Sequence, residues 1–396
     1  MNILLLKGLS SYGALHIQID QAAAAFRSLG HDVTVADFED SVEGEETVQA
    51  ALAQRVDFCF ALNAICADVA MTRSSFGPLL DTAYVTAIVD HPIYHQERLQ
   101  AGLPHYVVCT IDPSHLDFLE AWAGPGKYAA TAFVPPGGNK PDTLPDMDVE
   151  RYFAERDIPI LFTGTYRGAP RRVWADWEPN LNKDLMETAT ELVLDTGTYS
   201  VEEAVREVLD GWGIELESEK LAGLLSSLTF LHRYIEAYRR HEMLVTLGKA
   251  GVPLSVYGNG WEPLCEAYPS FQYGGIGSVE ETLGLLRRSR ICLSTNNNFI
   301  RGGHERVFTA MCNGAAVVSE ASTFYESAFV EDQEIVLFRW RELRMLPTML
   351  NAVLKSPERL HAIAQAGHRK ALEEHTWVSR ARDILELVEK VGPRPR

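Results

Sequence analysis

The sequence predicts an α/β protein made of two domains, each with a parallel sheet covered by helices. Short β-branched and apolar runs alternate with helical patterns, a stretch rich in Pro, Gly and Asp interrupts the alternation at residues 135–148, and the alternation then resumes. The chain has 396 residues, of which 46% are hydrophobic, and this is enough for two hydrophobic cores. We therefore expect two α/β domains joined by a linker.

The first domain is expected to span residues 1–140. Its first strand is the apolar run Asn2–Leu6, and a loop at residues 7–13 leads from it to a helix that Gly30 ends. Five further strands are predicted in the runs HDVTVADF, VDFCFAL, YVTAIVD, HYVVCTI and YAATAFV. Functional groups in sheets of this kind gather at the carboxyl ends of the strands.

The second domain is expected at residues 157–373, after a linker at residues 141–156. Its strands are predicted in IPILFTGTY, VPLSVYGNG, FQYGG, RICLSTN, AAVVSE and EIVLF. The helical patterns at about residues 175–250 are too long for one crossover, so they predict a helical insertion in this domain. Within it, Ser200 and Glu203 have the spacing of a capping box. Residues 374–396 are expected to form a last amphipathic helix.

Charge and cysteine usage restrict the class of protein. The formal net charge of −18 argues against a partner of nucleic acid or anionic lipid. The six cysteines are scattered without paired metal spacing, as is typical of a reducing compartment. The sequence lacks an apolar run of roughly 18 residues, and its start lacks the features of a signal peptide. A cytoplasmic protein without stable membrane insertion is predicted.

The loop KGLSSYGAL carries Gly8 and Gly13 at the spacing of the outer glycines of a P-loop. Ala14 and Leu15 stand where a P-loop needs Lys and Ser or Thr, so a site for a nucleoside triphosphate is disfavoured here. A loop that approaches a ligand and an ordinary turn both remain open.

No metal site is predicted from the sequence. His91 and His95 are four residues apart, but Pro92 between them disfavours a regular helix through the pair. Asp146 and Asp148 form an Asp-x-Asp pattern within the linker, where we expect a solvated turn.

The stretch from Asn296 to Glu320 predicts an anion site. A polar loop, Asn296–Gly303, follows a predicted strand, and a helix is expected to begin at His304 or Glu305. The two glycines of the loop would let backbone amides approach a ligand, and the helix dipole adds positive potential. Arg306 on the first turn would donate in a forked geometry to phosphate oxygens. The alternative is an ordinary β-loop-α unit with a glycine-rich turn.

These residues also carry a family resemblance. The order GGHERVFTAMCNGAAVVSE, EIVLF and LKSPERLHAIAQAGHRKALEEHTWVSRARDIL resembles the CgeB-like (spore maturation protein) branch of glycosyltransferases, which have the GT-B fold and a group 1-type nucleotide-sugar-binding C-terminal domain. The segment ILFTGTYRGAPRR is similar to the opening strand and arginine loop of that domain, and VYGNGW to another of its recurring elements. The resemblance covers most of residues 158–390 outside the helical insertion.

The resemblance implies two Rossmann-like domains that face each other across a cleft, with the acceptor on the first and the nucleotide-sugar donor on the second. It implies that the last helix crosses back to the first domain. The residues that it implies for donor binding are Arg167, Arg171, Arg172, Tyr257, Gly258, Asn259, Gly260, Gly302, Gly303, His304, Glu305, Arg306 and Thr309. Thr309 stands where many relatives carry a glutamate for the ribose, so the ribose contact and the nucleotide stay open.

The predicted function is a metal-independent glycosyltransferase that moves a sugar from a UDP-sugar or another NDP-sugar to a hydroxyl of a polysaccharide, protein or small metabolite. No further cofactor is expected. Asp90 and His91, at the end of a predicted strand, are the candidates for a general base, with His16 near the first loop as competitor. A non-catalytic binding module of the same fold and a nucleotide-sugar epimerase are the alternatives.

Overall fold

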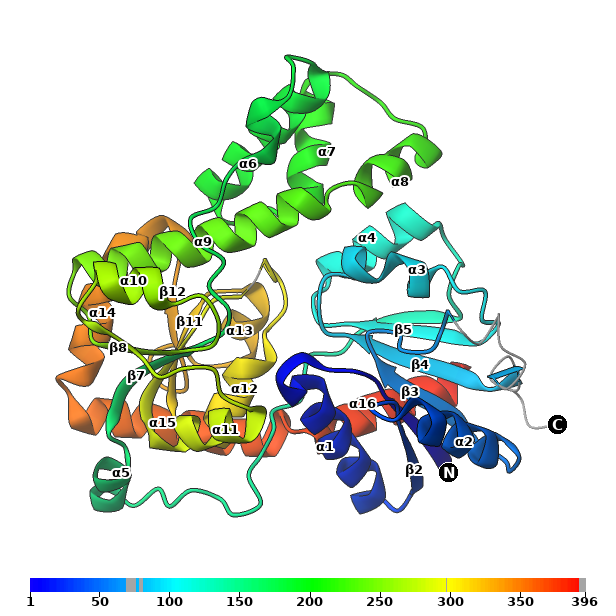
Figure 1. Cartoon of the computed structure of the whole chain (residues 1–396), viewed down its shortest axis with the longest axis horizontal. Helices are drawn as coiled ribbons and strands as arrows, with labels where there is room; N and C mark the ends of the chain where they lie inside the picture. The colour runs from blue at the N-terminus through cyan, green and yellow to red at the C-terminus, as the bar shows by residue number, and fades with distance from the viewer. Residues whose placement is uncertain (69–75, 78–80, 297, 392–396) are drawn as a thin grey trace. The chain divides into compact units, whose positions relative to one another are not determined.

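The chain forms two compact units, each built around a parallel six-stranded sheet (Figure 1). The computed structural model describes residues 1–68, 76–77, 81–296 and 298–391. Unit 1 comprises Met1–Asn139, Ser218–Ser226 and His375–Arg396, and unit 2 comprises Lys140–Glu217 and Ser227–Glu374. The predicted α/β class is confirmed. Asn297, which belongs to the polar loop singled out above, lies outside the described residues.

The sheet of unit 1 has the strand order β2-β1-β3-β4-β5-β6, and all adjacent strands run parallel. Its strands are β1 Asn2–Lys7, β2 Asp32–Asp37, β3 Phe58–Leu62, β4 Ala83–Ile88, β5 Tyr106–Thr110 and β6 Ala130–Phe133. Each of β3, β4 and β5 is buried along its whole length. Continuous apolar runs are expected for central strands of a parallel sheet, because helices cover both faces.

Two helices from opposite ends of the chain share the core of unit 1. The helices of this unit are α1 Ala14–Ser28, α2 Ser41–Leu52, α3 Gln96–Leu99, α4 Ser114–Ala123, α8 Ser218–Ser226 and α16 Trp377–Val391, with 3-10 turns at Ser11–Gly13 and Pro92–His95. Phe26 of α1 and Trp377 of α16 are both buried in this core, and the Trp377 ring lies 6.4 Å from the Phe60 ring. Gly137 fits against this indole because it has no Cβ.

The sheet of unit 2 has the order β12-β11-β10-β7-β8-β9, again with parallel neighbours. Its strands are β7 Ile158–Thr163, β8 Leu254–Tyr257, β9 Phe271–Tyr273, β10 Ser289–Ser294, β11 Ala316–Glu320 and β12 Val336–Phe338. Successive side chains point to opposite faces, so Ile160 and Phe162 join one apolar cluster while Leu161 joins another. The predicted strands of both domains are thus present.

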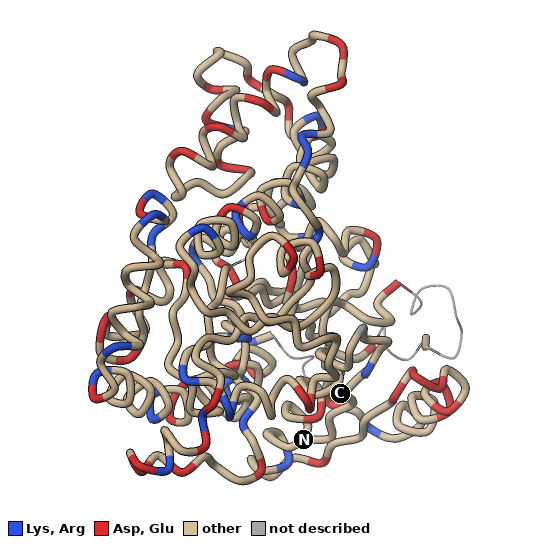
Figure 2. The backbone as a smooth tube through the Cα atoms, turned by 60° about the vertical axis from the view of Figure 1, so that its left-hand side comes forward, with Lys and Arg blue, Asp and Glu red and all other residues tan. Residues whose placement is uncertain are grey.

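Helices surround the sheet of unit 2, and several of them lie in the long segment between β7 and β8. They are α5 Val149–Glu155, α6 Leu181–Thr196, α7 Val201–Gly211, α9 Thr229–Lys249, α10 Glu262–Ala267, α11 Val279–Arg288, α12 Glu305–Cys312, α13 Thr323–Ala328, α14 Leu346–Leu354 and α15 Pro357–Glu374, with 3-10 turns η4 Val173–Asp176 and η5 Trp340–Met345. The predicted capping box of Ser200 and Glu203 is confirmed at the start of α7. Acidic positions recur along α6 and α7, at the top of Figure 2.

Helix α8 differs from the expectation that the whole helical insertion belongs to the second domain. This helix is part of unit 1, where it lies beside α4. Trp122 Nε1 of α4 donates to the Ser226 hydroxyl at 2.8 Å, and Gln96 donates to the Ser226 carbonyl at 3.1 Å. Hydrophobic periodicity reveals a helix but not which core the helix joins, so the sequence offered no sign of this attachment.

The Asp-x-Asp pattern of the linker forms the solvated turn that was predicted. Asp148 caps α5 by accepting from the backbone N–H groups of Glu150 and Arg151. Asp146 accepts from the N–H of Asp148 at 2.8 Å and pairs with the Arg151 guanidinium. Both carboxylates therefore stabilise the local backbone.

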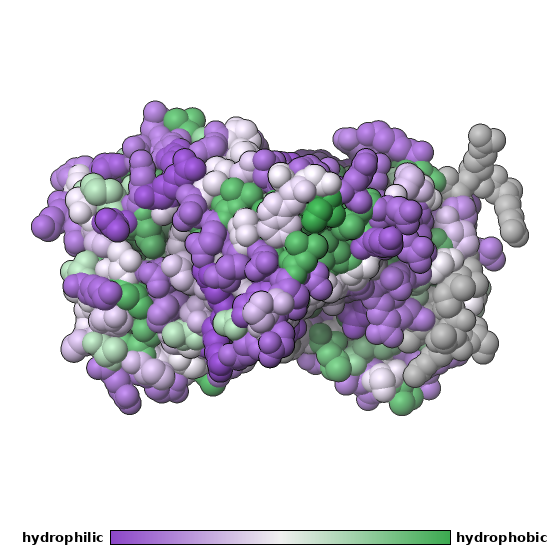
Figure 3. All heavy atoms as spheres, turned by 90° about the horizontal axis from the view of Figure 1, so that it is seen from above, coloured by the Kyte–Doolittle hydropathy of each residue, from purple (hydrophilic) through white to green (hydrophobic). Residues whose placement is uncertain are grey.

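None of the described helices has the length and apolar character needed to cross a bilayer. On the face shown in Figure 3, hydrophobic residues are interspersed with hydrophilic ones.

The packing of α16 leads to a stability prediction. Replacing Trp377, which is 4% exposed, with Ala should lower the free energy of unfolding by about 3–5 kcal/mol, since an aromatic side chain leaves a large cavity. Chemical denaturation followed by circular dichroism measures this change. The control is Leu9→Ala, because Leu9 is 75% exposed and should cost less than about 0.5 kcal/mol. Equal losses in both variants would mean that α16 does not hold the core of unit 1.

Candidate functional site

The loops after β7 and β8 are joined by backbone hydrogen bonds at the carboxyl edge of the unit 2 sheet. The N–H of Gly164 donates to the Tyr257 carbonyl, and the N–H of Tyr166 donates to the Asn259 carbonyl, each at 2.9 Å. Trp261, which is fully buried, donates from Nε1 to the Gly164 carbonyl at 2.8 Å. The predicted residues Tyr257 and Asn259 therefore hold the two loops together through their backbones.

Gly258 and Gly260 make this close approach possible. A Cβ on Gly258 would lie 2.2 Å from the Gly164 carbonyl oxygen, and a Cβ on Gly260 would lie 2.2 Å from the Tyr166 carbonyl oxygen. Both glycines also have positive φ, at 124° and 81°, which other residues rarely adopt. These two predicted positions thus shape the edge on which a ligand would rest.

Arg306 lies on the first turn of α12, which follows the polar loop after β10. His304 caps this helix, because its Nδ1 accepts from the Arg306 N–H at 3.1 Å. The Arg306 guanidinium lies 5.7 Å from the centre of the Phe162 ring. Its Nη1 is buried and has no hydrogen-bond partner among the residues that the structure describes. A buried cationic donor without a partner calls for an explanation, and an anionic ligand is one.

Arg240 lies in the electrostatic field of two further arginines, Arg306 and Arg167. Arg240 of α9 is 7% exposed and donates from Nη1 to the Thr165 carbonyl at 2.7 Å. Burial first, and then the neighbouring guanidinium groups of Arg306 and Arg167, lower the pKa of Arg240 to about 10. The Glu236 carboxylate, 3.4 Å away, opposes this change. We call Arg167, Arg240 and Arg306 the arginine cluster.

Arg240 was not among the site residues predicted from the sequence. Its one signal was the pair Arg239-Arg240 within a helix that is otherwise amphipathic, and such pairs are common on solvated helix faces. Its role is seen only in the fold, where Arg240 donates to a carbonyl of the loop after β7.

His304 is neutral next to this cluster. Burial first, followed by the charges of Arg306 and Arg240, holds the pKa of His304 well below its usual range. Because Nδ1 accepts a hydrogen bond, the neutral ring carries its proton on Nε2. His304 therefore offers a neutral N–H donor beside the cationic ones.

Glu305 and Thr309 are hydrogen-bonded across one turn of α12. The Thr309 hydroxyl donates to Glu305 Oε1 at 2.8 Å, and Thr309 is 3% exposed. The hydroxyl that stands where a glutamate is expected is thus coupled to a carboxylate four residues earlier. Because residues four apart lie on the same face of a helix, the Glu305 carboxylate lies on the face of α12 that also carries Thr309.

Gly302 and Gly303 are both buried. A Cβ on Gly303 would lie 2.8 Å from the Tyr325 ring, and the Tyr325 hydroxyl accepts from the His304 N–H at 2.7 Å. Gly303 thus allows Tyr325 to pack beneath the start of α12, a role that the expectation of close ligand approach did not include.

The arginines of the loop after β7 separate into different environments. Arg167 is exposed and belongs to the cluster. Arg172 pairs with Glu187 and with another glutamate of α6, and its side chain also contacts a tyrosine of α9. Arg171 forms an exposed ion pair with Asp176 at 2.7 Å. Arg172 and Arg171 are therefore engaged by acids of their own loop and of α6, and Arg167 is the one of the three that acts on Arg240.

In unit 1, Asp90 lies just after β4 and is held by two neighbours. Asn63 Nδ2 donates to Asp90 Oδ2 at 3.0 Å, while Asn63 Oδ1 accepts from the Val89 N–H at 2.9 Å. His95 Nε2 lies 3.5 Å from the same carboxylate, whose side chain is 56% exposed. Asn63 has a positive φ of 51°, and such backbone strain clusters at functional sites.

His91 is placed differently from its neighbour. It is 7% exposed, and its Nδ1 accepts from the Ile93 N–H at 3.1 Å, which caps the following turn. Its lone pair is therefore occupied, whereas the Asp90 carboxylate still reaches solvent. This geometry favours Asp90 over His91 as a base.

His16 joins two segments of unit 1. Its Nε2 lies 2.7 Å from the Gly8 carbonyl, and its Nδ1 lies 3.1 Å from the Glu39 carboxylate. Both ring nitrogens thus have partners within the first loop and the segment after β2.

Comparison with known proteins gives a matching segment and a fold. Residues 239–386 match the family described as glycosyl transferase-like, and this match includes Arg240, Arg306 and Glu305. No curated protein matches the sequence.

Solved structures resemble the chain over nearly its whole length. Sucrose-phosphate synthase from Thermosynechococcus elongatus is 12% identical with a TM-score of 0.57, and 99% of each chain is covered. Anabaena HepE in complex with UDP and glucose is 12% identical with a TM-score of 0.53, covering 98% of this chain and 100% of HepE. AviGT4, a glycosyltransferase of avilamycin A biosynthesis, is 12% identical with a TM-score of 0.51, covering 99% and 98%. The chain therefore has the GT-B fold, with a glycosyl transferase-like segment at residues 239–386, most of which lies in unit 2.

Proposed function

We propose that the protein is a glycosyltransferase that moves a sugar from a nucleoside diphosphate sugar to an acceptor hydroxyl. The observation that carries this proposal is the arginine cluster around the start of α12, in which Arg306 Nη1 is buried without a partner among the described residues. A diphosphate matches several guanidinium groups in one place, because each can donate to phosphate oxygens.

The same groups would assist departure of the nucleoside diphosphate. Negative charge grows on the diphosphate as the bond to the sugar breaks, and prearranged donors in a poorly solvated site stabilise that charge without reorganisation. Arg306 and Arg240 are held by α12 and α9, and His304 adds a neutral donor. We expect this arrangement to work without a divalent cation, and activity in the presence of EDTA tests that expectation.

Glu305 and Thr309 are proposed to recognise the ribose of the donor. A carboxylate accepts hydrogen bonds from two adjacent hydroxyl groups, and the Thr309 hydroxyl fixes one oxygen of Glu305. UDP is the first nucleotide to test, since HepE binds UDP and glucose. The acceptor class and the cytoplasmic location remain predictions from the sequence.

Asp90 is proposed to take the proton from the acceptor hydroxyl. Asn63 holds one carboxylate oxygen, and the side chain is half exposed, so a bound hydroxyl can reach it. General-base catalysis of this kind contributes about 10²–10⁴-fold to the rate.

Replacing Arg306 with Ala should weaken UDP binding by about 1.5–3 kcal/mol, the scale of a lost hydrogen bond to a charged group. Isothermal titration calorimetry with UDP measures the change. The matched control is Arg171→Ala, which removes a guanidinium that is paired with Asp176 and should leave the affinity unaltered. Unchanged UDP affinity in a folded Arg306→Ala protein would remove the donor site from α12.

The depressed pKa of His304 predicts a pH dependence of stability. Below about pH 6.5, the usual pKa of histidine, the unfolded chain takes up a proton that the folded site refuses. Folding stability is therefore lost as the pH falls, with a slope approaching about 1.4 kcal/mol per pH unit from this group. His304→Asn keeps an N-cap acceptor without this titration, so urea unfolding between pH 7 and pH 5 should show a shallower loss. Parallel curves for both proteins would contradict the assignment.

Replacing Asp90 with Asn should slow sugar transfer by about a hundredfold or more while UDP affinity stays unchanged. Release of UDP from UDP-glucose in the presence of acceptor measures the rate. The comparison is His91→Asn, in which a buried cap is changed but no proposed base is lost, and a smaller effect on the rate is expected. If Asp90→Asn transfers sugar at the normal rate, the reaction proceeds without this base.

A further inference from the structure

A pocket of about 330 Å³ lies in unit 2 and is lined by residues other than those of the arginine cluster. Its walls come from the turn after α6, the loop before α12, the carboxyl end of β11 with the start of α13, and the start of η5. They include Thr196, Thr198, Glu320, Trp340 and Arg341. The volume is at the lower end of the roughly 300–1,000 Å³ of ligand pockets.

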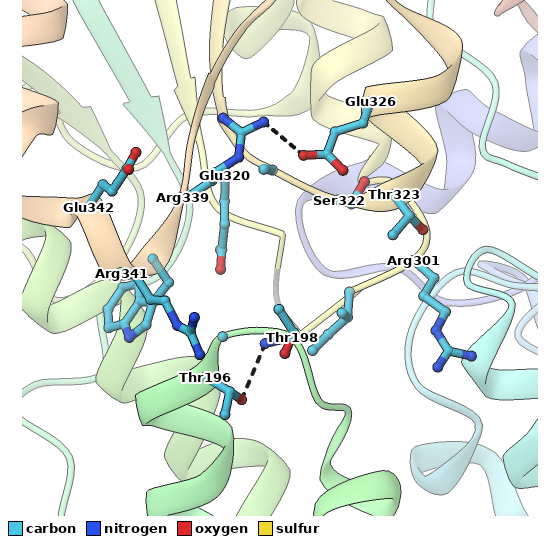
Figure 4. A pocket seen from close by; sticks show the side chains of 14 residues that line it. Thr196, Thr198, Arg301, Glu320, Ser322, Thr323, Glu326, Arg339, Arg341 and Glu342 are labelled. Atoms are coloured by element: carbon cyan, nitrogen blue, oxygen red, sulfur yellow. Dashed lines mark hydrogen bonds and ion pairs between the residues drawn. The ribbon is translucent and has the colours of Figure 1, made fainter.

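Glu320 forms the charged floor of this pocket. It is 6% exposed, and its carboxylate accepts from the Asn296 N–H at 3.2 Å and lies 3.5 Å from the Arg239 guanidinium. A carboxylate oxygen has a second lone pair, so Glu320 can still accept from a ligand. In Figure 4 the carboxylate of Glu320 and the guanidinium of Arg341 project toward the turn with Thr196 and Thr198.

Next to Glu320, the part of the chain that the structure describes leaves several buried polar atoms without partners. Among the described residues, buried atoms without a hydrogen-bond partner include Asn296 Oδ1, Thr295 Oγ1 and Arg239 Nε. An amide oxygen accepts, a guanidinium N–H donates, and a hydroxyl does both.

The charges of the lining cancel. The arginines at positions 301, 339 and 341 are matched by the glutamates at positions 320, 326 and 342, and Arg339 is already paired with Glu326 at 2.8 Å. A strongly charged ligand would therefore gain little here. Trp340 adds an aromatic ring to this largely polar lining, and the C–H face of a sugar ring can pack against it.

We propose that this pocket binds an uncharged sugar ring, with Glu320 accepting from its hydroxyl groups and Trp340 packing against its apolar face, an inference that rests on the proposed sugar transfer. The ring could come from two sources, the transferred sugar of the donor or a sugar unit of the acceptor. The chemistry of recognition is the same for both. The site is separate from the arginine cluster, which is proposed to hold the diphosphate.

The test is saturation-transfer difference NMR with the methyl glycosides of glucose, galactose, mannose and N-acetylglucosamine. At least one of them should give a signal with the wild-type protein. Glu320→Gln should weaken its binding by about tenfold or more, the effect of one lost hydrogen bond to a charged group. Trp340→Ala should weaken it by about tenfold as well, because the apolar area that packs against the sugar is lost. The matched controls are Glu358→Gln, which changes an exposed glutamate in the first turn of α15 outside the pocket lining, and Trp212→Ala, which removes a 38% exposed indole just after α7. Both controls should bind like the wild type.

UDP and UDP-glucose are titrated into the same variants to separate the two sources. If the ring belongs to the donor, the pocket variants lose affinity for UDP-glucose but keep affinity for UDP. If it belongs to the acceptor, they lose the glycoside signal and bind both nucleotides normally. The proposal is overturned if no glycoside binds to the wild type and UDP-glucose binding is unaltered in both pocket variants. UDP binding reports independently on the arginine cluster, so a failure of the pocket is distinguished from a failure of the proposed donor site.

Discussion

The organisation of unit 2 depends on holding guanidinium groups in a poorly solvated place without giving each of them a carboxylate. Arg240 is anchored by a backbone carbonyl of the loop after β7, and that loop is in turn fixed to the loop after β8 by glycines that no larger residue could replace. Burying charge in this way costs stability, and the cost is reduced when an anion arrives. The architecture around β7, β8 and α12 is therefore best understood as a support for positive charge.

The fold was largely predictable because its information is local. Continuous apolar runs such as those of β3 and β5 can be satisfied in few ways other than the interior of a parallel sheet, and the capping box at Ser200 marks the start of α7. Periodicity does not encode which core a helix joins. The attachment of α8 to unit 1 comes from packing beside α4 and from hydrogen bonds to Ser226, and these contacts have no pattern along the chain.

The candidate site was predictable where the chain itself brings residues together, as in the run from Gly302 to Thr309. Residues that meet through the fold were missed. Arg240 reaches the site from a helix about sixty residues before α12, and Asn63 meets Asp90 across neighbouring strands. The sequence also assigned too many arginines of the loop after β7 to the donor site. Arg172 is paired instead with carboxylates of α6, which come close to it only in the folded protein.

The route of the chain has a consequence for how the molecule can be divided. The chain passes between the units at residues 139–140, 217–218, 226–227 and 374–375, so neither core is encoded by one continuous segment. A fragment ending near residue 140 would lack α8 and α16, and with α16 the Trp377 indole that fills its core. Synthesis must therefore reach the last helix before unit 1 can close, and the two halves could not have been exchanged between proteins as simple modules without carrying these distant helices with them.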